Sequence, residues 1–297
     1  MSNVKLKELI ESTIKHKGTG LHICPAAAPY IRVNGMLKPL EIPPLDNTIV
    51  KSLIDEAATV EQKRTLLNTN VAAFSFSING LGRFRACVYS QRGTRAMTVH
   101  ILPFGIPTFA ELRIPEDKIL QYMSKQKGLI LATGGTGTGK TTTLAAIVNH
   151  INETRCCHIA TIEDPIEYLH RHNKSIVTQK EIGADILDIQ TALRWATKSD
   201  PDIIMLNEMP HDESALKLVL SIAEEKLVLS GVTTTEPRKV INRLIEISGN
   251  SSLHQRMLSV LESVIHHDIQ PCNDEANGTQ CRTILIFGRK EIASCPS

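Results

Sequence analysis

Hydrophobic and polar residues follow two different periods in the two parts of the chain. Up to about residue 101, apolar residues recur at helical spacing over 4–16. They then occupy alternate positions in short runs that the dipeptides Asn34-Gly35 and Asn79-Gly80 interrupt. An Asn-Gly pair between alternating runs predicts a β-hairpin, and at the first pair it predicts a primed turn. The N-terminal part is therefore expected to form a small antiparallel sheet with helices on one side.

From residue 128 onward, short and almost wholly apolar runs alternate with runs of helical period. Strands of that kind, each followed by a helix, are typical of a parallel sheet that is covered on both faces. The predicted strands are 128–133, 157–163, 202–208 and 227–233, with a last one within 282–292. The predicted helices are 140–152, 186–198, 212–225, 237–247 and 253–266.

Three prolines and a glycine within 102–115 interrupt both patterns. Proline fits neither the interior of a helix nor a central strand, so this segment is expected to be a connector. The sequence thus predicts an α/β protein with an N-terminal α+β domain (1–103), a connector (104–115) and a larger domain with a mainly parallel sheet (116–297).

Composition narrows the function classes. Lys and Arg number 33 against 31 Asp and Glu, a formal net charge of +2, which argues against a protein that coats nucleic acid. No apolar run approaches the roughly 18 residues of a membrane span, and the first residues carry no apolar signal-peptide core. Seven cysteines without a Cys-x-x-Cys pair are typical of free thiols in a reducing compartment. A cytoplasmic protein is expected.

The strongest chemical signal is a phosphate-binding loop that directly follows the predicted strand 128–133 and precedes a predicted helix. It fits G-x-x-x-x-G-K-[ST] as Gly134-Gly135-Thr136-Gly137-Thr138-Gly139-Lys140-Thr141, with Thr142 next. Glycines let backbone N–H groups wrap phosphates, Lys140 would bridge the β- and γ-phosphates, and the Thr141 hydroxyl would ligate Mg²⁺. The alternative is a glycine-rich turn that merely contains a lysine. The strand before it and the helix after it favour nucleotide binding.

Hydrolysis also needs a carboxylate that orients water, and two acidic residues end predicted strands. Glu163 ends the strand 157–163, and Glu208 ends the strand 202–208. Carboxyl ends of parallel strands form the sites of open α/β sheets. The alternative for Glu163 is a capped turn before Pro165.

Three segments occur in an order that resembles the PilT family of secretion-type ATPases, which power type IV pilus retraction. They read GGTGTGKTTTLAA, HIATIEDPIEY and ALRWATKSDPDIIMLNEM, and the resemblance covers about residues 5–265. It implies a PAS-like domain followed by a RecA-like P-loop ATPase domain, with ATP and Mg²⁺ as ligands. It also implies a ring of six chains, an inner-membrane pilus platform protein as partner, and a paralogous pilus ATPase as a further candidate partner. No nucleic acid is expected. The implied location is the cytoplasm, with peripheral attachment to the inner membrane through partners.

The resemblance also assigns roles to single residues. Glu163 matches the family's catalytic glutamate, and Glu208 matches its Walker B glutamate. Arg83, Arg85 and Arg92 match an arginine-rich strand pair whose guanidiniums can stabilise phosphate charge across a subunit boundary. The alternative for these arginines is a solvated basic face of the sheet.

The chain also departs from the family pattern. Thr233 takes the place of the histidine in the family's His box, Asn207 stands where glycine is usual before Glu208, and Pro210-His211 stand where the family has arginine. The family's C-terminal helical region is expected to be absent. A nucleotide-binding accessory subunit with weak or no turnover is therefore an alternative to an active motor. A nucleotide kinase, a GTPase and a DNA translocase are weaker alternatives.

Overall fold

The structure is a computed structural model of the 297-residue chain, and it describes residues 4–102, 105–250, 252–271 and 280–293. The chain divides into two compact units, 1–104 and 105–297. The predicted junction at residues 103 and 104 lies outside the described residues. Each unit is described by itself below.

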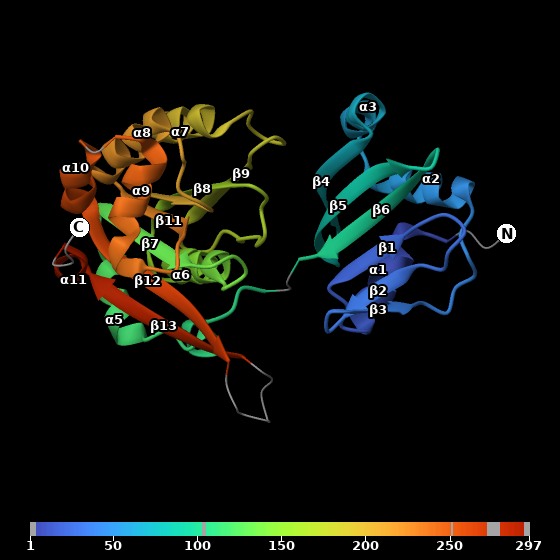
Figure 1. Ribbon diagram of the computed structural model, residues 1–297, viewed down its shortest axis with the longest axis horizontal. Coiled ribbons are helices and arrows are strands. Elements are labelled where there is room, and N and C mark those ends of the chain that lie inside the picture. Colours follow the sequence, from blue (N-terminus) through green and yellow to red (C-terminus); the bar gives the residue numbers. More distant parts are fainter. Residues whose placement is uncertain (1–3, 103–104, 251, 272–279, 294–297) are drawn as a thin grey trace. The chain divides into compact units, whose positions relative to one another are not determined.

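The first unit is an antiparallel sheet with three helices, in the strand order β3-β2-β1-β6-β5-β4 (Figure 1). Its elements are α1 (Leu6–Lys15), β1 (Gly20–Ile23), β2 (Tyr30–Val33), β3 (Met36–Pro39), α2 (Asn47–Ala57), α3 (Val60–Thr69), β4 (Val71–Ile78), β5 (Gly82–Gln91) and β6 (Thr94–Ile101).

Local chemistry explains several of these boundaries. Asn34 and Gly35 both have positive φ, at 50° and 79°, as a primed hairpin turn requires, so the predicted turn is confirmed. Thr59 and Gln62 form a reciprocal capping box at the start of α3. Alternate residues of β5, beginning with Phe84, are buried in one core with α1 and α2.

The second unit contains a seven-stranded sheet in the order β13-β12-β7-β11-β10-β8-β9, parallel except for the β12–β13 pair. Its elements are α4 (Phe109–Leu112), α5 (Glu116–Met123), β7 (Gly128–Gly134), α6 (Lys140–Thr154), β8 (His158–Glu163), β9 (Ile176–Glu181), α7 (Ile189–Lys198), β10 (Ile203–Leu206), α8 (Glu213–Ala223), β11 (Leu227–Thr233), a 3₁₀ turn η1 (Pro237–Lys239), α9 (Val240–Ser248), α10 (Leu253–Val260), β12 (Leu261–Pro271), β13 (Gln280–Gly288) and α11 (Arg289–Ala293).

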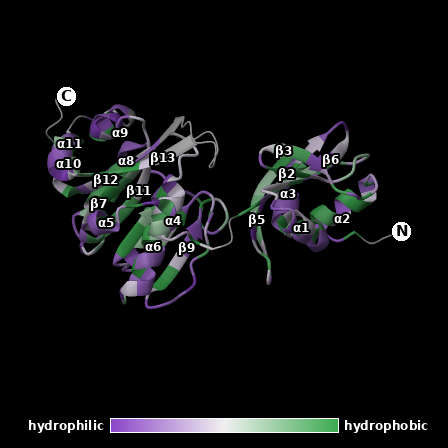
Figure 2. Cartoon of the chain, turned by 90° about the horizontal axis from the view of Figure 1, so that it is seen from below, coloured by the Kyte–Doolittle hydropathy of each residue, from purple (hydrophilic) through white to green (hydrophobic). Residues whose placement is uncertain are grey.

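Helices cover both faces of this sheet, as the apolar strands predict. Leu129 and Leu131 of β7 pack in a core with α8, α9 and α10, whereas Ile130 and Ala132 pack in a second core with α6. Figure 2 shows hydrophobic residues gathered on the central strands. The predicted fold class, an N-terminal α+β domain followed by a RecA-like domain with a mainly parallel sheet, is confirmed.

One predicted helix is wrong in its second half. The segment 253–266 was expected to be a single helix, but α10 ends at Val260 and β12 begins at Leu261. The hydrophobic pattern from Leu261 onward fits either a helix or a strand. Pairing with β7 decides for the strand, because it buries Val264 and Ile265 on opposite faces of the sheet. The paired histidines His266 and His267 therefore lie on a strand rather than at a helix end.

Further elements were not predicted, namely β1, α4, α5 and β9. β9 is a short edge strand next to β8, and its first residue, Ile176, is 63% exposed, so it lacks the apolar run of the other strands. The predicted connector 104–115 contains the helix α4, which starts at a capping box of Thr108 and Glu111.

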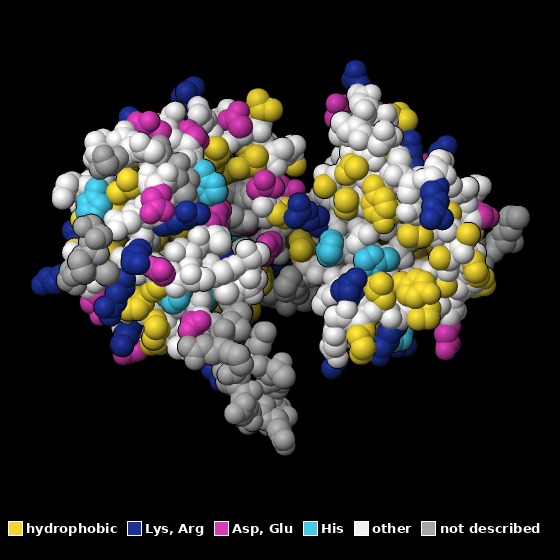
Figure 3. Space-filling view, in the orientation of Figure 1, with side chains coloured by type: hydrophobic (Ala, Val, Ile, Leu, Met, Phe, Trp, Pro, Cys, Tyr) yellow, Lys and Arg dark blue, Asp and Glu magenta, His cyan; other side chains and the backbone are white. Residues whose placement is uncertain are grey.

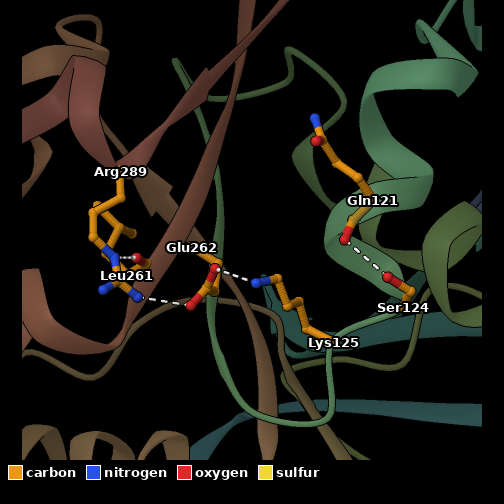
Figure 4. Close-up of polar contacts among 6 residues, drawn as sticks. All are labelled: Gln121, Ser124, Lys125, Leu261, Glu262 and Arg289. Atoms are coloured by element: carbon orange, nitrogen blue, oxygen red, sulfur yellow. Dashed lines mark hydrogen bonds and ion pairs between the residues drawn. The ribbon is translucent and has the colours of Figure 1, made fainter.

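A polar cluster lies at the amino-terminal end of β12 (Figure 4). Because β12 runs parallel to β7, this is the end of the sheet opposite the phosphate loop. Glu262 accepts from Arg289 Nη2 at 2.7 Å and pairs with Lys125 Nζ at 3.4 Å. Ser124 Oγ donates to the carbonyl of Gln121, which closes the end of α5. These contacts join the segments before β7 and after β13 to the same strand.

On the face of the second unit seen in Figure 3, Lys and Arg side chains lie interspersed with Asp and Glu. Within the described ranges, no helix is both long and apolar enough to cross a bilayer.

Candidate nucleotide-binding and catalytic site

The carboxyl ends of four neighbouring strands bring the predicted site residues to one edge of the sheet. β7 ends at Gly134, which pairs in register with Thr233 of β11. β10 lies next, and Glu208 follows it by two residues. β8 comes after β10 and ends at Glu163. The structure therefore places the phosphate loop, Thr233 and both candidate carboxylates along a single edge.

The phosphate loop has a conformation that only glycine tolerates at three positions. Gly134, Gly137 and Gly139 have φ values of 148°, 77° and 98°. A Cβ on Gly134 would lie 2.5 Å from Thr138 Oγ1 and 2.8 Å from the carbonyl oxygen of His267. The loop is thus tightly folded, and it leaves Thr136 and Gly137 exposed.

Lys140 begins α6 and folds back over this loop. Its Nζ donates to the carbonyl oxygens of Gly134 at 3.1 Å and Gly135 at 3.0 Å, and the residue is only 9% exposed. Burial lowers the pKa of Lys140, and the nearby carboxylate of Glu208 acts in the opposite direction. A buried ammonium that donates to two carbonyls is suited to donate to phosphate oxygens instead, because charged oxygens are stronger acceptors.

The two threonines after Lys140 occupy the first turn of α6, whose amino terminus carries the positive end of the helix dipole. Thr141 is half-buried there. The Thr142 hydroxyl shares a hydrogen bond of 3.0 Å with the hydroxyl of Tyr168, which connects the loop to the segment after β8.

Glu163 is buried and lies within a small polar network. Its Oε1 accepts from Thr161 Oγ1 at 2.6 Å and from Gln179 Nε2 at 2.9 Å, and the residue is 2% exposed. Burial raises the pKa of Glu163, while hydrogen bonds from Thr161, Gln179 and the backbone of Glu167 lower it in part. A carboxyl whose pKa is raised toward neutrality is better matched to accept a proton from water.

Gln179 was not among the predicted site residues, and it organises this side of the site. Its Nε2 also donates to the carbonyl of Tyr168, and its Oε1 accepts from His170 N at 2.8 Å. One side chain on β9 therefore holds both Glu163 and the segment that follows it. The sequence offered little signal for this role, because β9 itself was not predicted.

Glu208 is held by the substituted His-box segment. Its Oε1 accepts from the backbone N–H of Thr233 at 2.7 Å, so this contact does not depend on the Thr233 side chain. Both residues line a cavity of about 360 Å³ together with His211 and Arg243. Arg243 was not predicted as a site residue. This residue of α9 lies at the cavity where the family pattern has basic groups that the sequence lacks, and its guanidinium pairs with Glu246 at 3.5 Å.

Three comparisons relate this arrangement to known proteins. Residues 95–294 match the family described as Type II/IV secretion system protein. The chain is 35% identical over 265 residues to the type IV pilus retraction ATPase PilT of Pseudomonas aeruginosa, covering 88% of this chain and 76% of that protein. It is 32% identical to a twitching motility protein of Neisseria gonorrhoeae, covering 87% of this chain and 70% of that protein. The crystal structure of the pilus retraction motor PilT with bound ADP matches with a TM-score of 0.89 at 34% identity, covering 97% of this chain and 86% of that one.

The chain belongs to the type II/IV secretion system protein family. Within that family it is a PilT-like secretion ATPase, and the predicted family resemblance is confirmed. The phosphate loop predicts that the protein binds a nucleotide, and membership of this ATPase family agrees with that prediction.

In this secretion ATPase, Mg²⁺ would have few protein ligands. In the part of the chain that the structure describes, no group of three or more His, Cys, Asp or Glu side chains could hold a metal ion. Mg²⁺ bound with a nucleotide takes most of its ligands from phosphates and water, and one or two protein oxygens suffice. The Thr141 hydroxyl fits that requirement.

The predicted arginines of the secretion ATPase fall into two places. Arg83 and Arg85 lie near the start of β5 on the face opposite its buried residues. Arg92 lies in the turn after β5 with φ 46°, and it lines a hollow there together with Arg95. Roughly 23–30 Å of strand separates the two places. Arg83 and Arg85 therefore lie close together on one face of β5, and Arg92 lies apart from them.

His266 supports the phosphate loop of the secretion ATPase from the neighbouring strand. It pairs in register with Thr133, the residue before Gly134, and its Nδ1 lies 3.0 Å from Thr133 Oγ1 in a buried hydrogen bond. Burial lowers the pKa of His266, against an opposing effect of Asp268. Sequence reasoning missed this contact because it placed His266 on a helix.

We expect Thr133→Val to lower the free energy of unfolding by about 1–3 kcal/mol, because the isosteric change leaves a buried imidazole nitrogen unpaired. Urea unfolding of the nucleotide-free protein measures it. Thr133→Ser keeps the hydroxyl and is the control. Equal stability of the valine variant and the wild type would contradict a role for this hydrogen bond.

Proposed function

We propose that this PilT-like chain is the ATP-hydrolysing subunit of a ring motor that retracts a type IV pilus. The observation that carries the proposal is the single sheet edge that holds Lys140, Glu208 and Glu163 next to a glycine cradle. The similarity to pilus retraction proteins over most of the chain supports the direction of the motor.

Each group has a defined part in hydrolysis. The loop amides and Lys140 bind the phosphates and compensate charge that develops on them. Glu163 accepts the proton of the attacking water, because its raised pKa brings it closer to neutrality. Glu208 is fixed by the Thr233 amide beside Lys140 and orients the water and the lysine. When bound, Mg²⁺ would neutralise phosphate charge, with Thr141 as its protein ligand.

The assembly and its surroundings follow from the same proposal. Six copies would form the ring, and Arg83 and Arg85 of one copy would stabilise phosphate charge in the site of its neighbour. The ring would work in the cytoplasm against an inner-membrane pilus platform protein, with a paralogous pilus ATPase as a further candidate partner. The near-neutral net charge of +2 supports no nucleic-acid partner.

The alternative of an inactive accessory subunit is not favoured. The His-box change at Thr233 leaves the Glu208 contact intact, because a backbone amide makes it. The contacts of Lys140 with the phosphate loop and of Glu163 with Thr161 support an active site.

Glu208→Gln tests the function directly. We expect steady-state MgATP hydrolysis at ring-forming concentration to fall roughly a hundred-fold or more, because the amide still accepts the Thr233 N–H but cannot act as a carboxylate. Glu225→Gln changes an exposed glutamate before the opposite end of β11 and is the matched control. In cells, labelled pili should extend and fail to retract with Glu208→Gln. Tight ATP binding by the wild type without turnover above the variant would instead establish the accessory subunit.

A further inference from the structure

Asn207 connects the two segments that carry the candidate carboxylates. It immediately precedes Glu208, and its side-chain Nδ2 donates to the carbonyl oxygen of Pro165 at 3.1 Å. Pro165 follows Glu163 by two residues. The Asn207 backbone N–H also donates to the carbonyl of Ile162 at 3.2 Å. One residue at the end of β10 thus makes two hydrogen bonds to β8 and to the segment that follows it.

The chemistry of the amide fixes which of its atoms faces Pro165. A carbonyl oxygen accepts only from a donor, so the atom facing it must be the NH₂ group and not Oδ1. Oδ1 is the other polar atom of the same amide. It is buried and accepts no hydrogen bond from the described protein groups. A buried amide oxygen without a protein partner is rare, and it is available to a water molecule.

The backbone of Asn207 is held in place from the other side. A Cβ on Gly231 of β11 would collide with the carbonyl oxygen of Asn207, so the two strands approach closely there. Met209 N donates to the carbonyl of Gly231 at 2.8 Å. Because the main chain of Asn207 is held between β11 and β8, its side chain gives a fixed hydrogen-bond donor to the segment that begins at Asp164.

We propose that Asn207 is a positioning residue for ATP hydrolysis, whose NH₂ group ties the segment after Glu163 to the strand of Glu208. Its amide oxygen is a buried acceptor without a partner among the described protein groups. The inference rests on the proposed function. It acts through the placement of Glu163 and Glu208 and leaves the phosphate loop untouched, so it concerns turnover and not nucleotide binding.

Two variants of the full-length protein test this role. Asn207→Ala removes the donor and the acceptor, whereas Asn207→Asp keeps the size and the acceptor and removes the donor. The matched control is Asn152→Ala. Asn152 is buried on α6, and its Nδ2 donates to the carbonyl of Arg171 at 2.6 Å, at the far end of the same segment.

Both Asn207 variants should lower kcat roughly ten- to a hundred-fold and change the KM for MgATP less than about three-fold, because misplaced reacting groups cost turnover and not affinity. Asn152→Ala should leave kcat within about two-fold of the wild type. In nucleotide-free protein, hydrogen exchange of the amides of residues 166–168 should be roughly ten-fold faster in the Asn207 variants than in the wild type.

Three results would overturn the inference. Unchanged hydrogen exchange at 166–168 would show that Asn207 does not hold this segment. An unchanged kcat would show that Asn207 has no effect on turnover. An equal loss of kcat in Asn152→Ala would show that general loosening of the segment causes the effect. The proposed function fails separately. A wild type that hydrolyses no ATP refutes it and with it the turnover role, whereas the exchange experiment still decides whether the tether exists.

Discussion

Replacing Lys140 by alanine is expected to lower kcat/KM for MgATP at least roughly a thousand-fold, the largest loss of any single change in this protein. The lysine is the group of the phosphate loop that brings a full positive charge to the phosphates. It is already desolvated, with its Nζ on the carbonyls of Gly134 and Gly135, so little reorganisation is needed when phosphate replaces them. Steady-state hydrolysis and nucleotide titration measure the loss.

The same change should not unfold the protein. Burial of the ammonium disfavours its charged form, as its lowered pKa shows, so removing it relieves a cost of the folded state. Lys127→Ala is the matched control, since this exposed lysine lies just before the other end of β7 and should keep full activity. A Lys140→Ala variant with near wild-type turnover would refute the assignment of the phosphate loop.

The second large effect is expected for Glu163→Gln, which should lower kcat roughly a hundred-fold or more while raising the melting temperature. Glutamine keeps the shape and retains an acceptor for Thr161 and Gln179, but it cannot take a proton from water. It also removes a carboxylate whose charged form is disfavoured by burial. Activity and stability should therefore move in opposite directions.

The gain in stability should depend on pH with a defined sign. The pKa of Glu163 is raised in the folded state, so the folded protein holds this proton to a higher pH than the unfolded chain. The wild type loses stability as pH rises from the ordinary glutamate pKa through the raised value. Melting curves from about pH 4 to about pH 8 should show the variant's advantage at neutral pH and its disappearance in acid.

A change at Gln179 tests the pKa of Glu163 through the pH dependence of activity. Gln179→Leu removes a hydrogen bond that lowers the pKa of Glu163, so the acidic limb of the pH–activity profile should move to higher pH. A profile that does not move, together with Glu163→Gln that retains turnover, would show that Glu163 is a structural carboxyl and that the base lies elsewhere.

Several parts of the site could be predicted because they are contiguous in sequence. The phosphate loop combines strand, glycines, Lys140 and helix within a short segment, and its backbone angles follow from the glycines themselves. Glu163 and Glu208 could be predicted because one ends and the other closely follows an apolar strand of a parallel sheet, and such ends meet at one edge. The hairpin at Asn34-Gly35 belongs to the same class, since its turn chemistry is local.

Other parts depended on which strands become neighbours. The segment after Leu261 has a pattern that fits a helix or a strand, and only pairing with β7 decides for the strand and brings His266 to Thr133. Gln179 reaches Glu163 because β9 adds to the edge beside β8. The position of Arg243 at the Glu208 cavity likewise depends on how α9 packs against the sheet.

The amino-acid sequence by itself determined the two-part α/β architecture, the nucleotide-binding loop and the two acidic strand ends, because short-range backbone preferences and hydrophobic period encode them. The tertiary structure alone decided the environment of each group: the burial that raises the pKa of Glu163, the backbone amide that holds Glu208, and the amide of Asn207 on the Pro165 carbonyl. These contacts join residues far apart along the chain. Their partners are chosen by strand order, which follows from burying both faces of the sheet at once.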